Sequence, residues 1–450
     1  MTRPRFLALL GFIGSLWALG LLVPAAGRAA QPPTFEPGTL TSAFPRPVSW
    51  SFGFRSETAP QLVELLTELQ GSDVVFVSIP LPNEITQRAD GSWLVSGTDS
   101  GPVTPNTEYR ARLRLTTADG VFLGPEASVL VADERFHWQV RESERLRLHW
   151  YSGDATFATR ALRVGEDGVT KAETFLGLRL PTKVDVFVYA DEVPFRDAIG
   201  LGSPENAAGV PFPGIATLFA LIRPEQIDSS WVGEVVPHEL THLVLQAGIG
   251  PGVQVPLWLN EGFAVYLSRG DTASDRQAVS DAIHDGTLVP LDGLAGDFPT
   301  SGQNQRSLTA YSESVSALDY MDRTYGQARI AALVAGFVSK GPEQAFTDAL
   351  GVGQAGFGDA WLRSVGAPAP QVFGPQPAPS GPLPSDWLGP PPQGGLLPAP
   401  SPAASASPGP AAVPARPTGS STVALALLVV TALLATAALG AAIVRRRRSP

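Results

Sequence analysis

The chain has 450 residues, which is enough for two or three domains with cores of their own. Its formal net charge is −10, and basic residues at both ends leave the middle more acidic still, so nucleic acid is excluded as a partner. The absence of cysteine excludes disulfides, thiolate zinc sites and a cysteine nucleophile, so any metal must be held by carboxylates and by some of the five histidines.

The first thirty residues have the organisation of a secretory signal. Arg3 and Arg5 precede an apolar run over residues 6–22, and small residues at 25–30 offer cleavage sites. We therefore predict a signal peptide over residues 1–30. The apolar run is long for a signal, so an uncleaved membrane anchor stays open as the alternative.

Residues 33–135 contain short strand-like runs separated by turn signals. Val48–Phe52 and Tyr109–Leu115 alternate between apolar and polar residues, and Val74–Ile79 is apolar and rich in β-branched residues. The run Pro105–Tyr109 resembles the turn and tyrosine that precede a late strand in immunoglobulin-like and fibronectin-type sandwiches. The pattern predicts a β-sandwich domain without a catalytic cluster.

From residue 136 to 366 the pattern is that of helices with a few strands. Asp154–Leu176 has helical spacing, Val184–Tyr189 alternates as a strand, and Gly214–Ile222 is a second strand candidate with which an extended peptide could pair. After Ser230 the chain reads as helical almost to Val365, with breaks at Gly270, 286–299, Gly341 and Gly351. Strands followed by helices predict an α+β fold.

A short motif in the helical region carries the chemistry. His238 and His242 are four residues apart, so a helix places them on one face, where both can bind one zinc ion. Glu239 lies beside the metal in this arrangement and can take a proton from a water held there. Pro237 must either lie in the first turn of the helix or kink the helix. Both arrangements leave the two imidazoles on the same helix face. By itself the motif also fits two histidines on a solvated helix face.

A carboxylate further along the chain completes a ligand set. Eighteen residues separate His242 from Glu261, which lies at the start of a second apolar helical run, WLNEGFAVY. Two histidines and one glutamate fill three positions of a tetrahedral zinc site and leave the fourth to water, which is typical of catalytic sites.

HELTH followed by WLNEGFA at this spacing resembles the gluzincin metallopeptidases, including the M1 aminopeptidase-like group and the bacterial peptidase MA-like proteins. The resemblance extends over about residues 145–365. It implies a gluzincin-type fold, mostly helical with a small sheet, and one zinc ion per chain. It also implies that His238, His242 and Glu261 are the metal ligands and that Glu239 is the general base.

The same resemblance implies a tyrosine after the third ligand, whose hydroxyl stabilises the oxyanion. Tyr311 matches best by position, and Tyr320 and Tyr325 fall later on the same predicted helix. Asn260 either orients a ligand or caps the helix of Glu261, and capping is the more economical interpretation. Trp258 and Phe263 are expected to pack the core around Glu261.

Three further histidines, His137, His149 and His284, have no partner at ligand spacing and are expected to be structural or exposed. The M1 enzymes hold the free amine of the substrate with a glutamate in a Gly-x-Met-Glu-Asn strand. Here the matching run Gly214–Leu218 has no acid, so the resemblance leaves endopeptidase and aminopeptidase open.

The C-terminal region predicts attachment to a membrane. Residues 367–420 are rich in proline, alanine, glycine and serine and predict a disordered stalk. The uncharged apolar run 423–444 is long enough for a transmembrane helix, and the arginines of the tail 445–450 place the C-terminus in the cytoplasm. A sortase motif is absent, because no residue separates Pro417 from Thr418.

Together these features predict a membrane-tethered, extracytoplasmic zinc peptidase that acts on peptides or proteins and contacts the lipid bilayer through its C-terminal helix. The alternative is a surface adhesion protein whose zinc-site domain has lost catalysis, although an intact Glu239 argues against it. An intramembrane protease is excluded, because HELTH lies far from both hydrophobic runs. The sequence predicts neither the substrate nor the oligomeric state.

Overall fold

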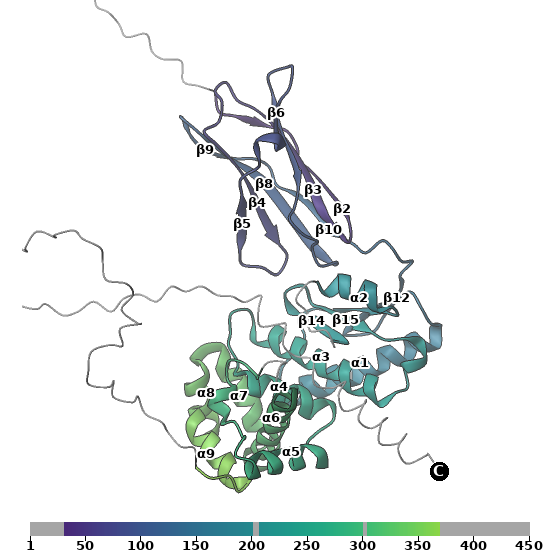
Figure 1. The fold of residues 1–450 in the computed structure, drawn as a ribbon, viewed down its shortest axis with the longest axis vertical. Coiled ribbons are helices and arrows are strands. Elements are labelled where there is room, and N and C mark those ends of the chain that lie inside the picture. Colours follow the sequence, from purple (N-terminus) through teal and green to yellow (C-terminus); the bar gives the residue numbers. More distant parts are fainter. Residues whose placement is uncertain (1–30, 201–206, 300–303, 370–450) are drawn as a thin grey trace, which may run out of the picture.

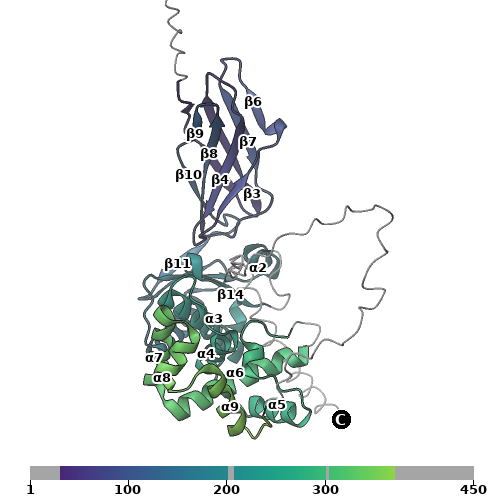
Figure 2. The ribbon, with the colours of Figure 1, turned by 90° about the vertical axis from the view of Figure 1, so that its left-hand side faces the viewer.

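The computed structural model describes residues 31–200, 207–299 and 304–369. Within these residues the fold is α+β. An N-terminal β-sandwich lies at one end of the molecule, and a second, mostly helical part lies at the other (Figure 1). After a quarter turn the two parts still lie end to end, so the molecule is elongated (Figure 2). The predicted signal peptide, transmembrane helix, tail and nearly all of the stalk lie outside the described residues. None of the helices that are described has the length and apolar character needed to cross a membrane.

The sandwich is built from two five-stranded antiparallel sheets. One has the order β1-β3-β7-β6 with β2 beside β3, and the other has the order β10-β8-β4-β5 with β9 beside β8. Their strands are β1 Thr34–Phe35, β2 Thr39–Ala43, β3 Arg46–Arg55, β4 Leu62–Leu69, β5 Val75–Ser78, β6 Ile85–Gln87, β7 Trp93–Thr98, β8 Thr107–Thr117, β9 Gly120–Leu123 and β10 Ala127–Val131.

Alternation along the strands makes the core of the sandwich. Every second residue of β8 is buried from Thr107 to Thr117, and its buried set meets the inner residues of β3 across the sandwich. Tyr109, the tyrosine of the predicted turn, is fully buried and its hydroxyl lies 3.3 Å from Thr67 Oγ1. The period-two pattern therefore faces one side of each sheet inward, as predicted.

The second part begins with a mixed sheet of order β11-β12-β13-β15-β14, in which β12, β13 and β15 run parallel. Its strands are β11 Gln139–Glu142, β12 Leu146–Trp150, β13 Val184–Tyr189, β14 Gly209–Phe212 and β15 Thr217–Leu221. The prediction for 214–222 was wrong in two respects. Pro213–Ile215 forms the 3-10 turn η2, and β15 is paired on both sides, by β13 and by β14, so no peptide can add to it. The edge strand on this side of the sheet is β14, and β11 is the edge strand on the other side.

Helices cover both faces of this sheet. α1 (Ala155–Leu176) begins at Asp154, whose carboxylate caps two backbone N–H groups, and packs with α3 (Ser230–Ile249) on one face. α2 (Glu192–Ile199) covers the other face and was not predicted. The remaining helices form a bundle beside α3: α4 Leu257–Ser268, α5 Ala273–His284, α6 Asn304–Tyr325, α7 Gln327–Lys340, α8 Pro342–Leu350 and α9 Gln354–Ser364.

One arginine ties the connection between the two parts together. Arg135 donates to both carboxylate oxygens of Asp133 at 2.8 Å and to Asp197 of α2 at 2.6 Å. Its guanidinium lies 5.0 Å from the centre of the Phe44 ring in the sandwich. The Tyr189 hydroxyl also donates to the fully buried Asp133 carboxylate, at 2.9 Å. We refer to these five residues as the Arg135 joint.

Candidate metal centre

The two histidines of the motif lie on a helix that is buried on all sides. Every residue of α3 from Val235 to Leu245 is buried, so the helix runs through the middle of the domain rather than along its surface. This excludes a solvated face for His238 and His242, which are 1% and 4% exposed. α3 continues through Pro237, where the ring lies against Gly168 of α1.

Glu261, the third predicted metal ligand, is on α4, a helix that packs between α3 and α6. Trp258 stacks on Phe357 of α9 with ring centres 5.7 Å apart, and Phe263 is fully buried, so both fix this helix as predicted. A Cβ atom on Gly262 would lie 2.9 Å from the Ser314 carbonyl oxygen. Because glycine has no side chain, α4 can approach α6 closely at this position. Glu261, the residue before Gly262, is fully buried beside the histidines.

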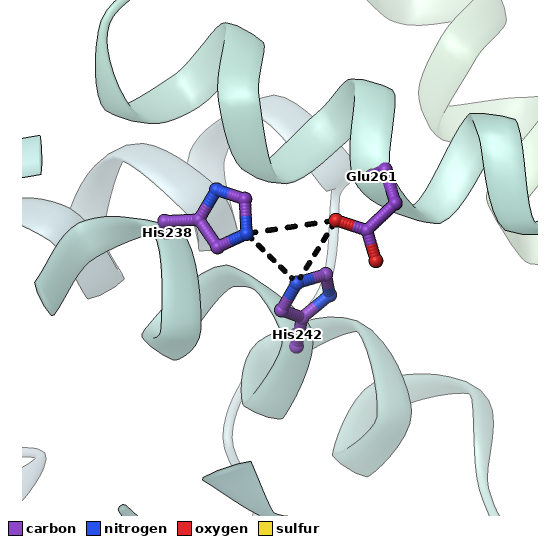
Figure 3. Close-up of side chains that lie close together, drawn as sticks. All are labelled: His238, His242 and Glu261. Carbon is purple, nitrogen blue, oxygen red and sulfur yellow. Dashed lines mark hydrogen bonds and ion pairs between the residues drawn. The ribbon is translucent and has the colours of Figure 1, made fainter. Parts of the chain in front are cut away.

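The three side chains converge on one point (Figure 3). The Nε2 atoms of His238 and His242 are 3.2 Å apart, and Glu261 Oε2 lies 3.6 Å from the first and 3.7 Å from the second. Ligands held roughly 2.1 Å from a tetrahedral zinc ion are about 3.4 Å from one another, so the spacing fits that ion. Among the residues described, this is the one group of three or more acidic or histidine side chains with ligand atoms within 4.8 Å of one another.

The chemistry of the donors also fits a cation. Both oxygens of Glu261, both of Glu239 and Nδ1 of His238 are buried and have no hydrogen-bond partner. A buried carboxylate without a partner costs several kcal/mol, which a divalent ion between the donors would offset. The residues present therefore fit zinc with two nitrogen ligands and one oxygen ligand.

Asn260 orients one of the ligands. Its Oδ1 lies 3.0 Å from His242 Nδ1, so Nδ1 donates its hydrogen to this oxygen and Nε2 turns its lone pair toward the centre. The prediction that Asn260 caps the helix was wrong. α4 begins at Leu257 after Pro256, one turn earlier than the sequence indicated, so Asn260 lies within the helix.

Burial sets the protonation of the donors. It lowers the pKa of His238 to about 3, helped by the positive charge of Arg269, and it also lowers the pKa of His242 against the opposing pull of Glu261. Burial raises the pKa of Glu261 to about 7, while His242 opposes this shift. Both imidazoles are therefore neutral at pH 7, which is the form that binds a metal.

Glu239 lies between α3 and the edge strand of the sheet. A Cβ atom on Gly209 of β14 would lie 2.8 Å from Glu239 Cγ, so β14 passes directly over this side chain. Burial and then the negative charge of Glu261 raise the pKa of Glu239 well above its usual range. A divalent cation beside the two carboxylates would favour their ionised forms and so prepare Glu239 to accept a proton.

Tyr311 lies in the same buried region. It is on α6, is 6% exposed and packs edge-on against Phe298 with ring centres 5.0 Å apart. Burial raises the pKa of Tyr311, and the negative charges of Glu261 and Glu239 add to this shift. Tyr320 and Tyr325 instead pack against Phe357 of α9.

The other histidines lie away from the centre. His137 and His284 are exposed, whereas His149 stacks on Phe187 and has its Nε2 2.6 Å from Asp185 Oδ1.

Sequence reasoning missed a buried network beside the centre. Asp275 on α5 accepts two hydrogen bonds from Arg269 and one each from the Ser312 hydroxyl and the Thr272 backbone. The network joins the end of α4 to α6 next to Tyr311. The spacing of Thr272 and Asp275, a capping box, is the one signal that could have placed part of it.

Comparison with known families places this segment. Residues 164–367 match the sequence profile of the family described as "Peptidase MA superfamily". This segment of the chain belongs to the peptidase MA superfamily. All five predicted site residues fall within this peptidase MA segment.

Solved structures give a weaker likeness. An M1 zinc metallopeptidase from Deinococcus radiodurans is 12% identical, with a TM-score of 0.34, over 75% of this chain and 95% of that one. An aminopeptidase N family protein from Idiomarina loihiensis is 9% identical, with a TM-score of 0.33, over 72% and 73%. No curated protein matches the chain. TM-scores this low support no conclusion about the function of this chain. Any such conclusion rests on the family match and on the geometry of the site.

Proposed function

We propose that the protein is a zinc-dependent peptidase that hydrolyses peptide bonds in peptides or proteins. The observation that carries the proposal is the convergence of His238, His242 and Glu261 within 4.8 Å, with the unpartnered carboxylate of Glu239 beside them. The family of residues 164–367 supports the same reaction class.

Each side chain then has a definite task. Bound zinc supplies Lewis-acid polarisation of the scissile carbonyl and of the attacking water. His238, His242 and Glu261 hold the ion, and Asn260 keeps His242 in the tautomer that binds it. Glu239 takes a proton from the water and returns it to the leaving amine. The Tyr311 hydroxyl donates a hydrogen bond to the carbonyl oxygen as negative charge develops there.

The proposal covers endopeptidase and aminopeptidase activity. The strand β15 and the turn before it have no acid that could hold a free amine. The edge of β14 is the free strand edge beside Glu239, and an extended substrate backbone can pair there.

The proposed location rests on the sequence alone. A signal over 1–30, a stalk over 367–420 and a span over 423–444 would tether the peptidase to the cell membrane, with the catalytic part outside the cytoplasm.

A peptide-library digest tests the activity. The purified full-length chain is incubated with a diverse library, with and without a zinc chelator, beside Glu239→Gln. We expect chelator-sensitive cleavage that falls by about 10²–10⁴-fold in the variant, because a general base contributes that much. The variant should keep stoichiometric zinc, measured by atomic emission. Mass spectrometry of the fragments distinguishes internal cleavage from removal of single N-terminal residues.

Stoichiometric zinc without any cleavage, and no difference between the chain and Glu239→Gln, would favour the alternative of an adhesion protein with a degenerate zinc site.

A further inference from the structure

One edge of the sandwich is apolar and unprotected. β5 is the last strand of its sheet, and Val75, Phe76 and Val77 are 46%, 47% and 51% exposed. Val74 and Ile79 continue the run at 48% and 64%. We refer to residues 74–79 as the β5 edge. Both faces of this strand meet solvent, since all four of its residues are exposed.

Proteins usually protect such an edge. A strand edge leaves backbone N–H and C=O groups free to pair with another chain, and charges, prolines or bulges normally prevent this. The β5 edge has no charged residue and no proline, and its pairing with β4 from Leu65↔Ser78 to Glu68↔Val75 is regular. An unprotected apolar edge of this kind indicates a binding partner.

The β5 edge is continuous with the surroundings of the metal centre. The turn that leads into it approaches η2 so closely that a Cβ atom on Gly71 would lie 2.3 Å from the Gly214 carbonyl oxygen. Gly214 is in η2, the turn between β14 and β15, and Gly209 of β14 packs against the side chain of Glu239. β5 and β14 are edge strands of their sheets, and in Figure 1 each is drawn at the left-hand edge of its own sheet.

We propose that the β5 edge binds an extended apolar segment of a protein substrate as an added strand, while another part of the same substrate enters the metal centre beside β14. Main-chain hydrogen bonds to β5 give the affinity, and the exposed side chains of Val75 and Val77 select apolar residues. This inference rests on the proposed peptidase function and names its substrate class, a protein with an exposed extended apolar segment.

Other occupants fit less well. Between Ser72 and Gln87 the only charged residues are Asp73 and Glu84, so an anionic membrane surface would be repelled. The five half-exposed apolar side chains of the β5 edge make a patch of a few hundred Å², below the roughly 800 Å² per partner that stable dimers bury. In the run 367–420 of the chain itself, prolines recur every few residues, and each proline lacks the N–H group that a regular ladder needs.

Binding is tested without catalysis. Full-length Glu239→Gln is titrated into a fluorescein-labelled peptide of alternating valine and threonine, capped at both ends, and fluorescence anisotropy is measured. The same peptide with alternate backbone nitrogens methylated keeps its side chains but loses the donors for a strand ladder. We expect saturable binding of the first peptide and at least about tenfold weaker binding of the second.

Variants locate the binding site. Val77→Lys in the same background should weaken binding at least about tenfold, because it places a charge on the edge. Val121→Lys is the matched control, since Val121 is a 61% exposed valine on β9 of the same sandwich, and it should leave binding unchanged. Equal binding of the methylated peptide, or equal effects of the two lysines, would overturn the proposal.

Activity separates this inference from the proposed function. In the otherwise unmodified chain, Val77→Lys should raise KM for an unfolded protein substrate about tenfold and leave kcat/KM for a short peptide unchanged. Peptide binding that depends on β5 without any hydrolysis would reject the peptidase and keep the strand-binding surface. A dimer that Val77→Lys dissociates, measured by sedimentation, would show that a second copy covers the edge and would reject the inference.

Discussion

At the scale of single residues, the hydrogen bond from His242 to Asn260 determines how well one ligand is oriented. Asn260→Ala removes the acceptor and lets the ring rotate, so we expect zinc affinity to fall by about 10–100-fold, the usual cost of losing such a partner. Competition with a chromogenic chelator measures the change. Asn260→Asp keeps an acceptor at the same place and should retain most of the affinity; equal loss in both variants would contradict this role.

Glu313 offers a test of stability against pH. It is fully buried, accepts one hydrogen bond from the Val289 backbone, and burial raises its pKa from 4.5 to about 8. Between these values the unfolded chain loses the proton and the folded chain keeps it, so the free energy of unfolding falls as pH rises. Glu313→Gln cannot lose this proton and still accepts from Val289. The difference in unfolding free energy between Glu313→Gln and the unmodified chain should therefore grow with pH in favour of the variant. We expect it to be near zero at pH 4.5 and a few kcal/mol at pH 8.

Urea unfolding at pH 5 and at pH 8 measures this advantage. A Glu313→Gln variant whose stability relative to the unmodified chain is the same at both values would show that the carboxyl is already ionised in the folded protein.

Several site residues could be predicted from the sequence because their signals are local. HELTH and the glutamate at 261 follow helical spacing and a recognisable interval, and the structure brings these side chains together. Arg269, Asp275 and Ser312 could not be predicted as a group, because they meet only once α4, α5 and α6 pack. Asn260 was misjudged because the start of α4 was placed too late.

At the scale of elements, the approach of α4 to α6 depends on a glycine. Alanine in a helix is usually about 1 kcal/mol more favourable than glycine. Gly262→Ala should do the opposite and lower the free energy of unfolding by roughly 1–3 kcal/mol, because its Cβ would meet the Ser314 carbonyl. It should also weaken zinc binding, since Glu261 moves with the helix. Chemical denaturation and zinc titration provide the two measurements.

Gly233 is the matched control on α3. No atom lies within 4 Å of the position of its missing Cβ, so Gly233→Ala should stabilise the protein by about 0.5–1 kcal/mol. Destabilisation of similar size in both variants would mean that the space at Gly262 is not the cause.

Individual elements were predicted well where periodicity alone decides them. Val184–Tyr189 has its predicted bounds, and α1 begins one residue after the predicted start, with Asp154 as its cap. α2 was missed because its eight residues are too few for a clear helical period. The place of β15 inside the sheet could not be read from its own residues, because strand order depends on non-local pairing.

At the scale of the whole molecule, the Arg135 joint connects the sandwich to the helical part. Arg135→Ala leaves the buried Asp133 carboxylate without its cation, so we expect the unfolding free energy to fall by about 3–5 kcal/mol. The Phe44 and Asp197 contacts are lost too, so small-angle scattering should show a broader range of domain orientations.

The exposed pair Arg55–Asp90 supplies the control, with side chains 56% and 59% exposed. Arg55→Ala should cost no more than about 1 kcal/mol. An Arg135→Ala chain as stable and as compact as Arg55→Ala would show that the joint does not hold the two parts.

The donor set at the centre has a consequence for oxidative conditions. Only imidazole nitrogens and a carboxylate oxygen converge there, and neither follows the oxidation series that starts from a thiolate. The chain has no cysteine, and its one methionine besides Met1 is Met321, which is fully buried. Peroxide concentrations that release the metal from thiolate sites should therefore leave this centre loaded.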